Sequence, residues 1–282
     1  MPRERRNEHG GRAGGEESHA VAVGVFDGVH RGHLAVLGYL RAVGDQLRVP
    51  TAVVTFDPHP LAVLRPESAP RLLSDVDERA RLLRSTGLVD HVGVIRFDRR
   101  VAGQPAEDFV RTELVDGLGA RAVVVGRDFR FGAGRAGDVA LLEELGGCYG
   151  FTTLGVPLLA AGRGESRCSS TFVRRLVEAG RLEVAARLLG RPYELCGMAE
   201  SVLPGADLPI QLPPGRCLPP HGRYYARLVD VIGRVHRATV SLSASDAVVA
   251  RLPRSAAPPP PGRIRLAFGR FLGAPLDAAL PA

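Results

Sequence analysis

Two histidines three residues apart, His30 and His33, are the residues of this chain best placed to do chemistry. They open a segment whose leucines recur at helical spacing. Residues i and i+3 share a helix face, so both imidazoles can point at one object. The N-terminus of a helix also offers free N–H groups and a partial positive charge to an anion, and Gly32 keeps the backbone accessible there. The pattern predicts a site for the phosphates of a nucleotide.

The same spacing also occurs in surface pairs of histidines and in half of a metal site. The setting of the pair favours the phosphate site. Residues 20–26 form an apolar run long enough for a buried parallel strand, and Asp27 and Gly28 end it with a turn. The two histidines would then lie just beyond the carboxyl end of a strand.

A second polar segment, F-D-P-H-P at residues 56–60, follows another apolar run. Its two prolines stiffen the backbone and would present Asp57 and His59 at the edge of a sheet. For His59, a rigid turn and a ligand contact are equally good interpretations.

A third polar segment, G-R-D-F-R-F-G, begins at Gly126, which would let a ligand approach the main chain. Asp128 can accept a hydrogen bond from a ring or ribose donor. Phe129 and Phe131 can flank a planar ring, and each could equally pack in the core.

A fourth segment places hydroxyl groups at the start of a helical stretch, residues 172–189. Ser169 there is a natural N-cap. Ser170 and Thr171 add hydroxyls and free N–H groups, and Arg174 adds a guanidinium near the first turn, a set that suits a triphosphate.

Apolar runs alternate with helical periodicity from residue 20 to about 190, which predicts an α/β fold with a parallel sheet and right-handed crossovers. The predicted strands are residues 20–26, 51–56, 91–96, 122–126 and 151–157. Between them, helices are predicted around residues 33–43, 75–86, 106–117 and 138–145. Ligands of such folds bind at the carboxyl ends of the strands, where the polar segments fall.

The character of the sequence changes after Tyr193. Pro and Gly dominate residues 204–220, and alternating runs follow that are typical of strands. These runs are residues 224–231, 238–242, 247–252 and 263–268. We therefore expect three parts: a disordered tail at 1–18, an α/β domain at 19–190 and a small β-rich domain at 191–282.

Composition excludes several classes of protein. The chain has 282 residues and a net charge of +7, and all 37 of its basic residues are arginine. Without lysine it has neither a Walker-type P-loop nor the amine for a Schiff base. The lysine-containing loop of class I aminoacyl-tRNA synthetases, which also carry an H-x-G-H, is missing as well. No basic run is interleaved with aromatic residues, so a nucleic-acid partner is not indicated.

Other features concern the compartment. No apolar run approaches the ~20 residues that a membrane helix needs, so no membrane partner is expected. The first eighteen residues lack the apolar stretch of a secretory signal. Four cysteines without C-x-x-C spacing fit reduced thiols and predict a cytoplasmic protein. They are Cys148, Cys168, Cys196 and Cys217.

The ordered set of motifs resembles the FMN adenylyltransferase module of bacterial bifunctional riboflavin kinase/FAD synthetases. The set is G-x-F-D-G-V-H-x-G-H, F-D-P-H-P, G-x-D-F-x-F-G, S-S-T-x-x-R and L-G-R-P-Y, across residues 20–197. The resemblance implies a Rossmann-like nucleotidyltransferase fold that joins AMP from ATP to FMN with Mg²⁺ and releases pyrophosphate. It does not identify the residues that would bind the metal ion.

Site residues follow from the resemblance by motif. The catalytic set would be His30, His33 and Arg174. The ATP-binding set would be Gly24, Phe26, Asp27, Gly32, Asp128, Ser170 and Thr171. The flavin-binding set would be His59, Phe129 and Phe131. Cys168 stands where the family usually has an aliphatic residue, a mild exchange because a free thiol packs as a small hydrophobe.

The resemblance fails in the second domain, where the family has a riboflavin-kinase barrel with a P-T-A-N motif. Residues 197–220 contain no Thr or Asn. We therefore expect a degenerate barrel without riboflavin kinase activity. Two alternatives stay open: a nucleotidyltransferase for a modified flavin or another phosphorylated acceptor, and a non-catalytic protein that binds flavin nucleotides.

Overall fold

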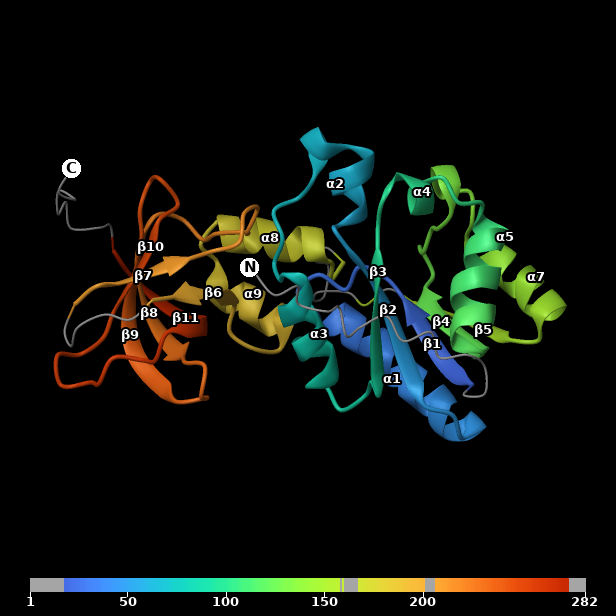
Figure 1. Ribbon diagram of the computed structural model, residues 1–282, viewed down its shortest axis with the longest axis horizontal. Helices are drawn as coiled ribbons and strands as arrows, with labels where there is room; N and C mark the ends of the chain where they lie inside the picture. Colours follow the sequence, from blue (N-terminus) through green and yellow to red (C-terminus); the bar gives the residue numbers. More distant parts are fainter. Residues whose placement is uncertain (1–17, 158, 160–166, 201–205, 274–282) are drawn as a thin grey trace, which may run out of the picture. The chain divides into compact units, whose positions relative to one another are not determined.

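The computed structural model describes residues 18–157, 159, 167–200 and 206–273. These residues form two compact units (Figure 1). The first is built from the described parts of Met1–Val25, Leu34–Ser68 and Leu83–Leu158, and the second from Phe26–His33, Ala69–Leu82 and Leu159–Ala282. The expected tail lies almost wholly outside the described residues. In the part of the chain that the structure covers, no helix is long and apolar enough to cross a membrane.

A five-stranded parallel sheet forms the centre of the first unit, in the order β3-β2-β1-β4-β5. The strands are β1 (His19–Val23), β2 (Thr51–Asp57), β3 (His91–Arg96), β4 (Ala120–Gly126) and β5 (Thr152–Val156). All five strands were predicted from their apolar runs, and the α/β fold class is confirmed. The strand order reverses direction between β1 and β4, so the carboxyl ends of these two strands form the switch point where such sheets bind ligands.

Helices cover the sheet of the first unit. They are α1 (Arg31–Leu47), α2 (Pro60–Leu64), α4 (Arg99–Ala102), α5 (Ala106–Phe109), α6 (Asp116–Leu118) and α7 (Val139–Tyr149), with 3-10 turns at Pro66–Ser68 and Ala133–Arg135. Apolar side chains of α5 and α7 share one core with alternate residues of the central strands, as the alternation of side chains along a strand requires. Figure 1 shows α1 along the sheet away from α5 and α7.

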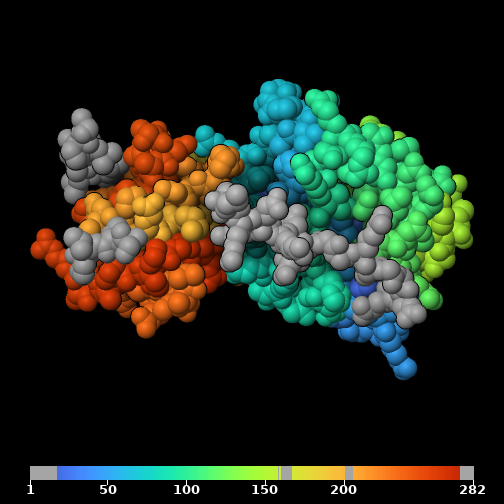
Figure 2. All heavy atoms as spheres, in the orientation of Figure 1, coloured from blue at the N-terminus to red at the C-terminus, as the bar shows by residue number. Residues whose placement is uncertain are grey.

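A closed six-stranded barrel dominates the second unit, with strands in the order β10-β7-β6-β11-β8-β9. They are β6 (Glu194–Ala199), β7 (Leu208–Gln211), β8 (Gly222–Val229), β9 (Val235–Leu242), β10 (Val248–Arg251) and β11 (Gly262–Gly273). Figure 2 shows the outer surface of the barrel in orange and red. Leu195, Leu228 and Leu266 are fully buried in it. A β-rich C-terminal region was predicted, and the barrel confirms it. The boundary near residue 191 stays a prediction.

Three helices belong wholly or mainly to the second unit: α3 (Val76–Arg84), α8 (Ser170–Glu178) and α9 (Leu182–Leu189). The single helix expected over residues 172–189 is therefore two helices. Gly180 separates them with φ +71°, a left-handed conformation that ends a helix. The helix expected over 106–117 also changes type, because a π-helical turn, Val110–Val115, follows α5.

Candidate functional site

The two histidines form a reciprocal cap at the N-terminus of α1. The backbone N–H of His33 donates to Nδ1 of His30, and the backbone N–H of His30 donates to Nδ1 of His33, each at 3.3 Å. The rings stack with centroids 3.6 Å apart and 17° between their planes. This is the geometry of a capping box, with imidazoles in place of the usual hydroxyl and carboxylate. The H-x-G-H motif thus caps α1 and at the same time fixes the two imidazole rings in place.

The cap decides which ring nitrogen carries the proton. Because Nδ1 of each neutral ring accepts a hydrogen bond from an N–H, the ring proton is assigned to Nε2. Burial lowers the pKa of His30 from 6.5 to about 4. Burial, together with the neighbouring His30 and Arg79, holds the pKa of His33 well below its usual value. Both imidazoles are therefore neutral near pH 7 and present two Nε2–H donors.

Close packing against residue 168 explains the glycine of the motif. A Cβ on Gly32 would lie 2.9 Å from the carbonyl oxygen of Cys168 and 3.0 Å from the ring of His30. Sγ of Cys168 in turn lies 3.7 Å from Nδ1 of His30. The backbone that precedes α8 therefore lies directly against the first turn of α1, and only glycine fits between them.

The turn that leads into the histidines is strained. Phe26, Gly28 and Val29 have φ values of +53°, +78° and +40°. A left-handed conformation is costly for a β-branched residue such as Val29, on the order of 1–3 kcal/mol, and persists only where surrounding contacts enforce it. The ring of Phe26 packs on that of His33 with centroids 5.1 Å apart. The turn thus orients one of the two imidazoles.

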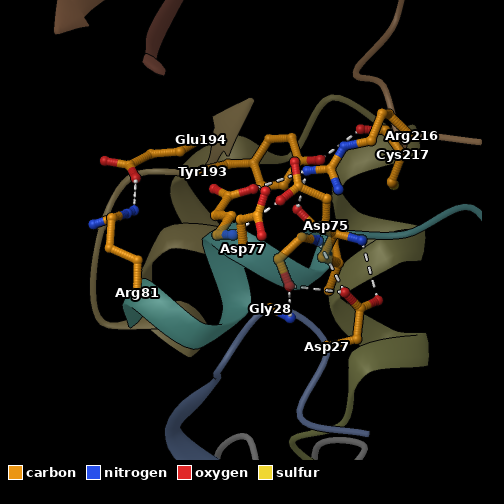
Figure 3. A network of polar contacts seen from close by, with 12 residues as sticks. Asp27, Gly28, Asp75, Asp77, Arg81, Tyr193, Glu194, Arg216 and Cys217 are labelled. Atoms are coloured by element: carbon orange, nitrogen blue, oxygen red, sulfur yellow. Dashed lines mark hydrogen bonds and ion pairs between the residues drawn. The ribbon is translucent and has the colours of Figure 1, made fainter. Parts of the chain in front are cut away.

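The buried carboxylate of Asp27 holds this turn from one side (Figure 3). Its Oδ1 accepts from the backbone N–H and the hydroxyl of Ser74, at 2.9 and 3.1 Å. Its Oδ2 accepts from the backbone N–H of Leu73 and from Nη2 of Arg174, each at 3.0 Å. The Gly28 N–H completes the set by donating to Oγ of Ser74 at 2.9 Å. Both oxygens of Asp27 are therefore engaged by the protein.

Arg191, which was not predicted as a site residue, holds the turn from the other side. Its Nη2 donates to the carbonyl oxygen of Gly28 at 2.8 Å, and its Nη1 to those of Val29 and Leu189 at 3.2 Å. The signal that could have found it is the L-G-R-P-Y motif. An arginine can satisfy several carbonyl groups at once because its guanidinium has five N–H donors in a fixed plane.

The start of α8 lies beside the same turn. Ser169 caps the helix as predicted, since its hydroxyl accepts from the Phe172 N–H at 3.2 Å. The hydroxyl of Ser170 donates to the carbonyl oxygen of Asp27 at 2.9 Å. Thr171 is exposed, and Arg174 is half-buried by its ion pair with Asp27. Within the second unit the fold thus brings together His30, His33, Asp27, Ser170 and Arg174.

The remaining predicted site residues lie in the first unit. Gly24 directly follows β1 and Gly126 ends β4, so both stand at the switch point of the sheet. Asp128 follows on the exposed loop after β4. Phe131 is buried in the core and stacks on Phe129, with centroids 5.5 Å apart, while Phe129 is only half-buried.

His59, also in the first unit, caps a short helix. Its Nδ1 accepts from the Leu61 N–H at 3.1 Å at the start of α2. This contact agrees with the interpretation of F-D-P-H-P as a rigid turn. As for metals, the described residues contain no group of three His, Cys, Asp or Glu side chains that could hold an ion. Both oxygens of the Asp27 carboxylate already accept hydrogen bonds from the protein.

Known proteins with similar sequences point to one family. The family model described as FAD synthetase matches residues 14–172. Proteins described as bifunctional riboflavin kinase/FMN adenylyltransferase are 40% identical over 182 residues in Escherichia coli K12 and 40% identical over 192 residues in Pseudomonas fluorescens. The matches cover 64% and 68% of this chain, and 57% and 60% of those proteins. The chain therefore spans less than two thirds of the length of these relatives.

One solved structure shares the fold. It is described as a macrolide-efflux protein from Streptococcus pneumoniae and superposes with a TM-score of 0.78 over 94% of this chain and 90% of that chain. At 21% sequence identity, the likeness concerns the fold alone.

Proposed function

Because the chain belongs to the FAD synthetase family, we propose that it transfers the adenylyl group of ATP to FMN, giving FAD and pyrophosphate. The observation that carries the proposal is the histidine capping box, which fixes two neutral Nε2–H donors at the N-terminus of a helix. Because these rings are neutral and fixed in orientation, their Nε2–H groups can donate hydrogen bonds to phosphate oxygens.

In the proposed reaction a phosphate oxygen of FMN attacks the α-phosphorus of ATP. The bond from that phosphorus to the oxygen bridging to the β-phosphate breaks, and pyrophosphate leaves with the electron pair. The nucleophile is already an anion, so no strong general base is needed. Catalysis is then positioning and stabilisation of negative charge on the transferring group.

Each predicted site residue named here from the second unit has its own role in the proposed reaction. His30 and His33 donate from Nε2 to oxygens of the transferring phosphate. Arg174 adds positive charge beside them, and Asp27 holds Arg174 in place. Ser170 and Thr171 offer N–H groups at the start of α8 to the phosphates. Mg²⁺ bound with ATP would neutralise part of the negative charge on its phosphates.

In the first unit, we propose that Gly24 and Asp128 contact the adenosine and that the half-buried Phe129 contacts the flavin ring. Phe131 would act from the core by supporting Phe129, through the stacking of the two rings. His59 would shape the loop after β2 by capping α2, and face the flavin from there.

We further propose that the barrel does not phosphorylate riboflavin. A kinase must hold the γ-phosphate and Mg²⁺ with suitably placed amide and hydroxyl groups. Residues 197–220 instead contain six prolines, which lack N–H donors. Arg216 in this segment is buried and engaged with Glu78. Residues 201–205 lie outside the described part of the chain.

A panel assay tests which acceptor and which nucleotide the protein uses. Purified protein is incubated with ATP or CTP and, in turn, FMN, a deazaflavin phosphate and pantetheine phosphate, and pyrophosphate release is measured. We expect release with ATP and FMN at the highest rate. Release with CTP, or a higher rate with another acceptor, would replace FMN adenylylation by that reaction. Tight binding of FMN without pyrophosphate release would make the protein a flavin-nucleotide binder.

A further inference from the structure

A short stretch of the barrel domain pairs with the loop that precedes α3. The N–H of Leu72 donates to the carbonyl oxygen of Gly215 at 2.7 Å, and the N–H of Cys217 donates to the carbonyl oxygen of Leu72 at 2.9 Å. These bonds make a parallel bridge between Leu72 and Arg216, in the connection from β7 to β8. Residues of the barrel domain therefore fix the loop at residues 72–74.

Arg216 is the buried centre of this contact, with only 4% of its surface exposed. Its Nη2 donates to the carbonyl oxygen of Leu73 at 2.9 Å and to Oε2 of Glu78 at 3.0 Å. Glu78, on α3, is equally buried. An arginine without a carboxylate partner would be costly at this depth, so Glu78 makes it possible for Arg216 to reach the Leu73 carbonyl.

One peptide group connects Arg216 to Asp27 and so to the turn that precedes His30. The carbonyl of Leu73 and the N–H of Ser74 belong to the same planar unit, which cannot twist between its two ends. Its carbonyl accepts from Arg216, and its N–H donates to Oδ1 of Asp27 at 2.9 Å. A shift of the guanidinium would therefore move the peptide plane and, with it, the carboxylate that holds the turn before His30 (Figure 3).

We propose that Arg216 is a positioning residue of the adenylyltransferase site, acting through the Leu73–Ser74 peptide and Asp27 on the histidine pair. The inference rests on the proposed function. It gives the barrel domain a role in the chemistry of the histidine motif that does not require a kinase site of its own. The two neighbours of Arg216 in sequence pair with Leu72 and so hold its backbone in place.

The test separates positioning from stability. Arg216→Met alone would leave Glu78 as an unpaired buried charge and would destabilise the fold. The double variant Glu78→Met and Arg216→Met removes both charges, and apolar pairs in place of buried ion pairs commonly keep or raise stability. We expect its unfolding midpoint to match the wild type, while kcat/KM for ATP falls tenfold or more because the Leu73 carbonyl has lost its donor. Arg216→Lys, which keeps one ammonium donor, should recover part of the loss.

A matched control is the double variant Asp207→Met and Arg251→Met, which removes an exposed arginine–carboxylate pair of the same barrel domain. It should leave kcat/KM for ATP unchanged. A folded Glu78→Met/Arg216→Met variant with wild-type kcat/KM would overturn the inference.

ATP binding is also measured by calorimetry, so that the role of Arg216 can be tested even if the protein does not form FAD. If the wild type binds ATP but forms no FAD, the proposed function fails, and the comparison of ATP dissociation constants still decides on Arg216. The inference expects weaker binding in the Glu78/Arg216 double variant, by about tenfold, and equal binding would contradict it.

Discussion

At the scale of single residues, the proposed reaction depends on two ring nitrogens, Nε2 of His30 and Nε2 of His33. The capping box assigns each Nδ1 to a backbone N–H, and we propose that each Nε2–H donates to the substrate. Neutral rings held in this way need no reorganisation when charge develops on a phosphoryl group, which is the condition for strong electrostatic catalysis.

Replacing His30 by Asn separates the cap from the donor. The Asn side-chain oxygen can still accept from the third N–H of α1, so the helix keeps its N-cap. The Nε2–H donor is lost. We expect an unfolding midpoint close to wild type and a fall in kcat of about 10²- to 10³-fold, as for other single transition-state donors. An unchanged kcat in folded His30→Asn would remove this imidazole from the mechanism.

His30 should also make the fold sensitive to acid. Burial lowers its pKa to about 4, while in the unfolded chain it titrates near 6.5. As pH falls, the unfolded state binds the proton first, so the stability that depends on neutral His30 is complete above about pH 6.5 and is lost as the pH falls towards 4. The loss between pH 8 and pH 5 amounts to about 2 kcal/mol.

Urea unfolding at pH 8 and pH 5 measures this loss in the wild type and in His30→Asn. The variant should lose about 2 kcal/mol less, on the same reasoning. Glu78, whose pKa burial raises to about 6, acts with the opposite sign but is present in both proteins and cancels in the comparison. Equal acid sensitivity of the two proteins would show that His30 is not buried as described.

At the scale of elements, the contact between the first turn of α1 and residue 168 is the tightest feature of the site. Gly32→Ala would place a methyl group 2.9 Å from the Cys168 carbonyl oxygen, and backbone atoms can yield only by moving α1 or the segment before α8. We expect a loss of stability of about 1–3 kcal/mol, typical of overpacking, and a lower kcat.

Gly38→Ala, in the same helix, is the matched control because nothing lies within 4 Å of its added Cβ. It should stabilise the protein by up to about 1 kcal/mol through helix propensity alone. Thermal unfolding of the two variants, read with kcat, decides the matter. A stabilised and fully active Gly32→Ala would contradict the close packing of the motif.

The elements themselves were predictable to different degrees. Buried parallel strands such as β1 and β4 were recognised because both faces are apolar, which gives continuous runs in the sequence. β6 and β7 were not predicted. β6 carries a glycine at 197 and β7 a proline at 209, residues that weaken a strand signal, and the closed barrel overrides this local preference. The break between α8 and α9 was missed although Gly180 marks it.

The shared face of the two histidines was predictable from the sequence, and the contacts of the site were less so. The spacing of His30 and His33 indicated a shared helix face, and the structure places both rings there. The reciprocal cap depends on ring rotation, and the contacts of Asp27 depend on residues 46 and 147 positions away, so neither follows from a local pattern. The L-G-R-P-Y motif marked Arg191 but not its contacts with backbone carbonyls. Arg216 also donates to a backbone carbonyl, and no motif marked it.

At the scale of the whole molecule, the C-terminal strands close into a barrel, and we propose that this barrel has no riboflavin kinase activity. The protein incubated with riboflavin, ATP and Mg²⁺ should form no FMN at catalytic rates, because the six prolines of residues 197–220 remove N–H donors that a γ-phosphate site would use. Chromatography with flavin fluorescence detects the product. FMN formation by the pure protein would place a kinase site in the barrel that the sequence does not reveal.

A stoichiometric assay with FMN and ATP labelled at the α-phosphate tests adenylyl transfer most directly. We expect the label to appear in FAD, one pyrophosphate to be released per FAD, and His30→Asn to slow both alike. Protein that is folded and binds ATP, yet transfers no label to FMN, would contradict the proposed adenylyl transfer.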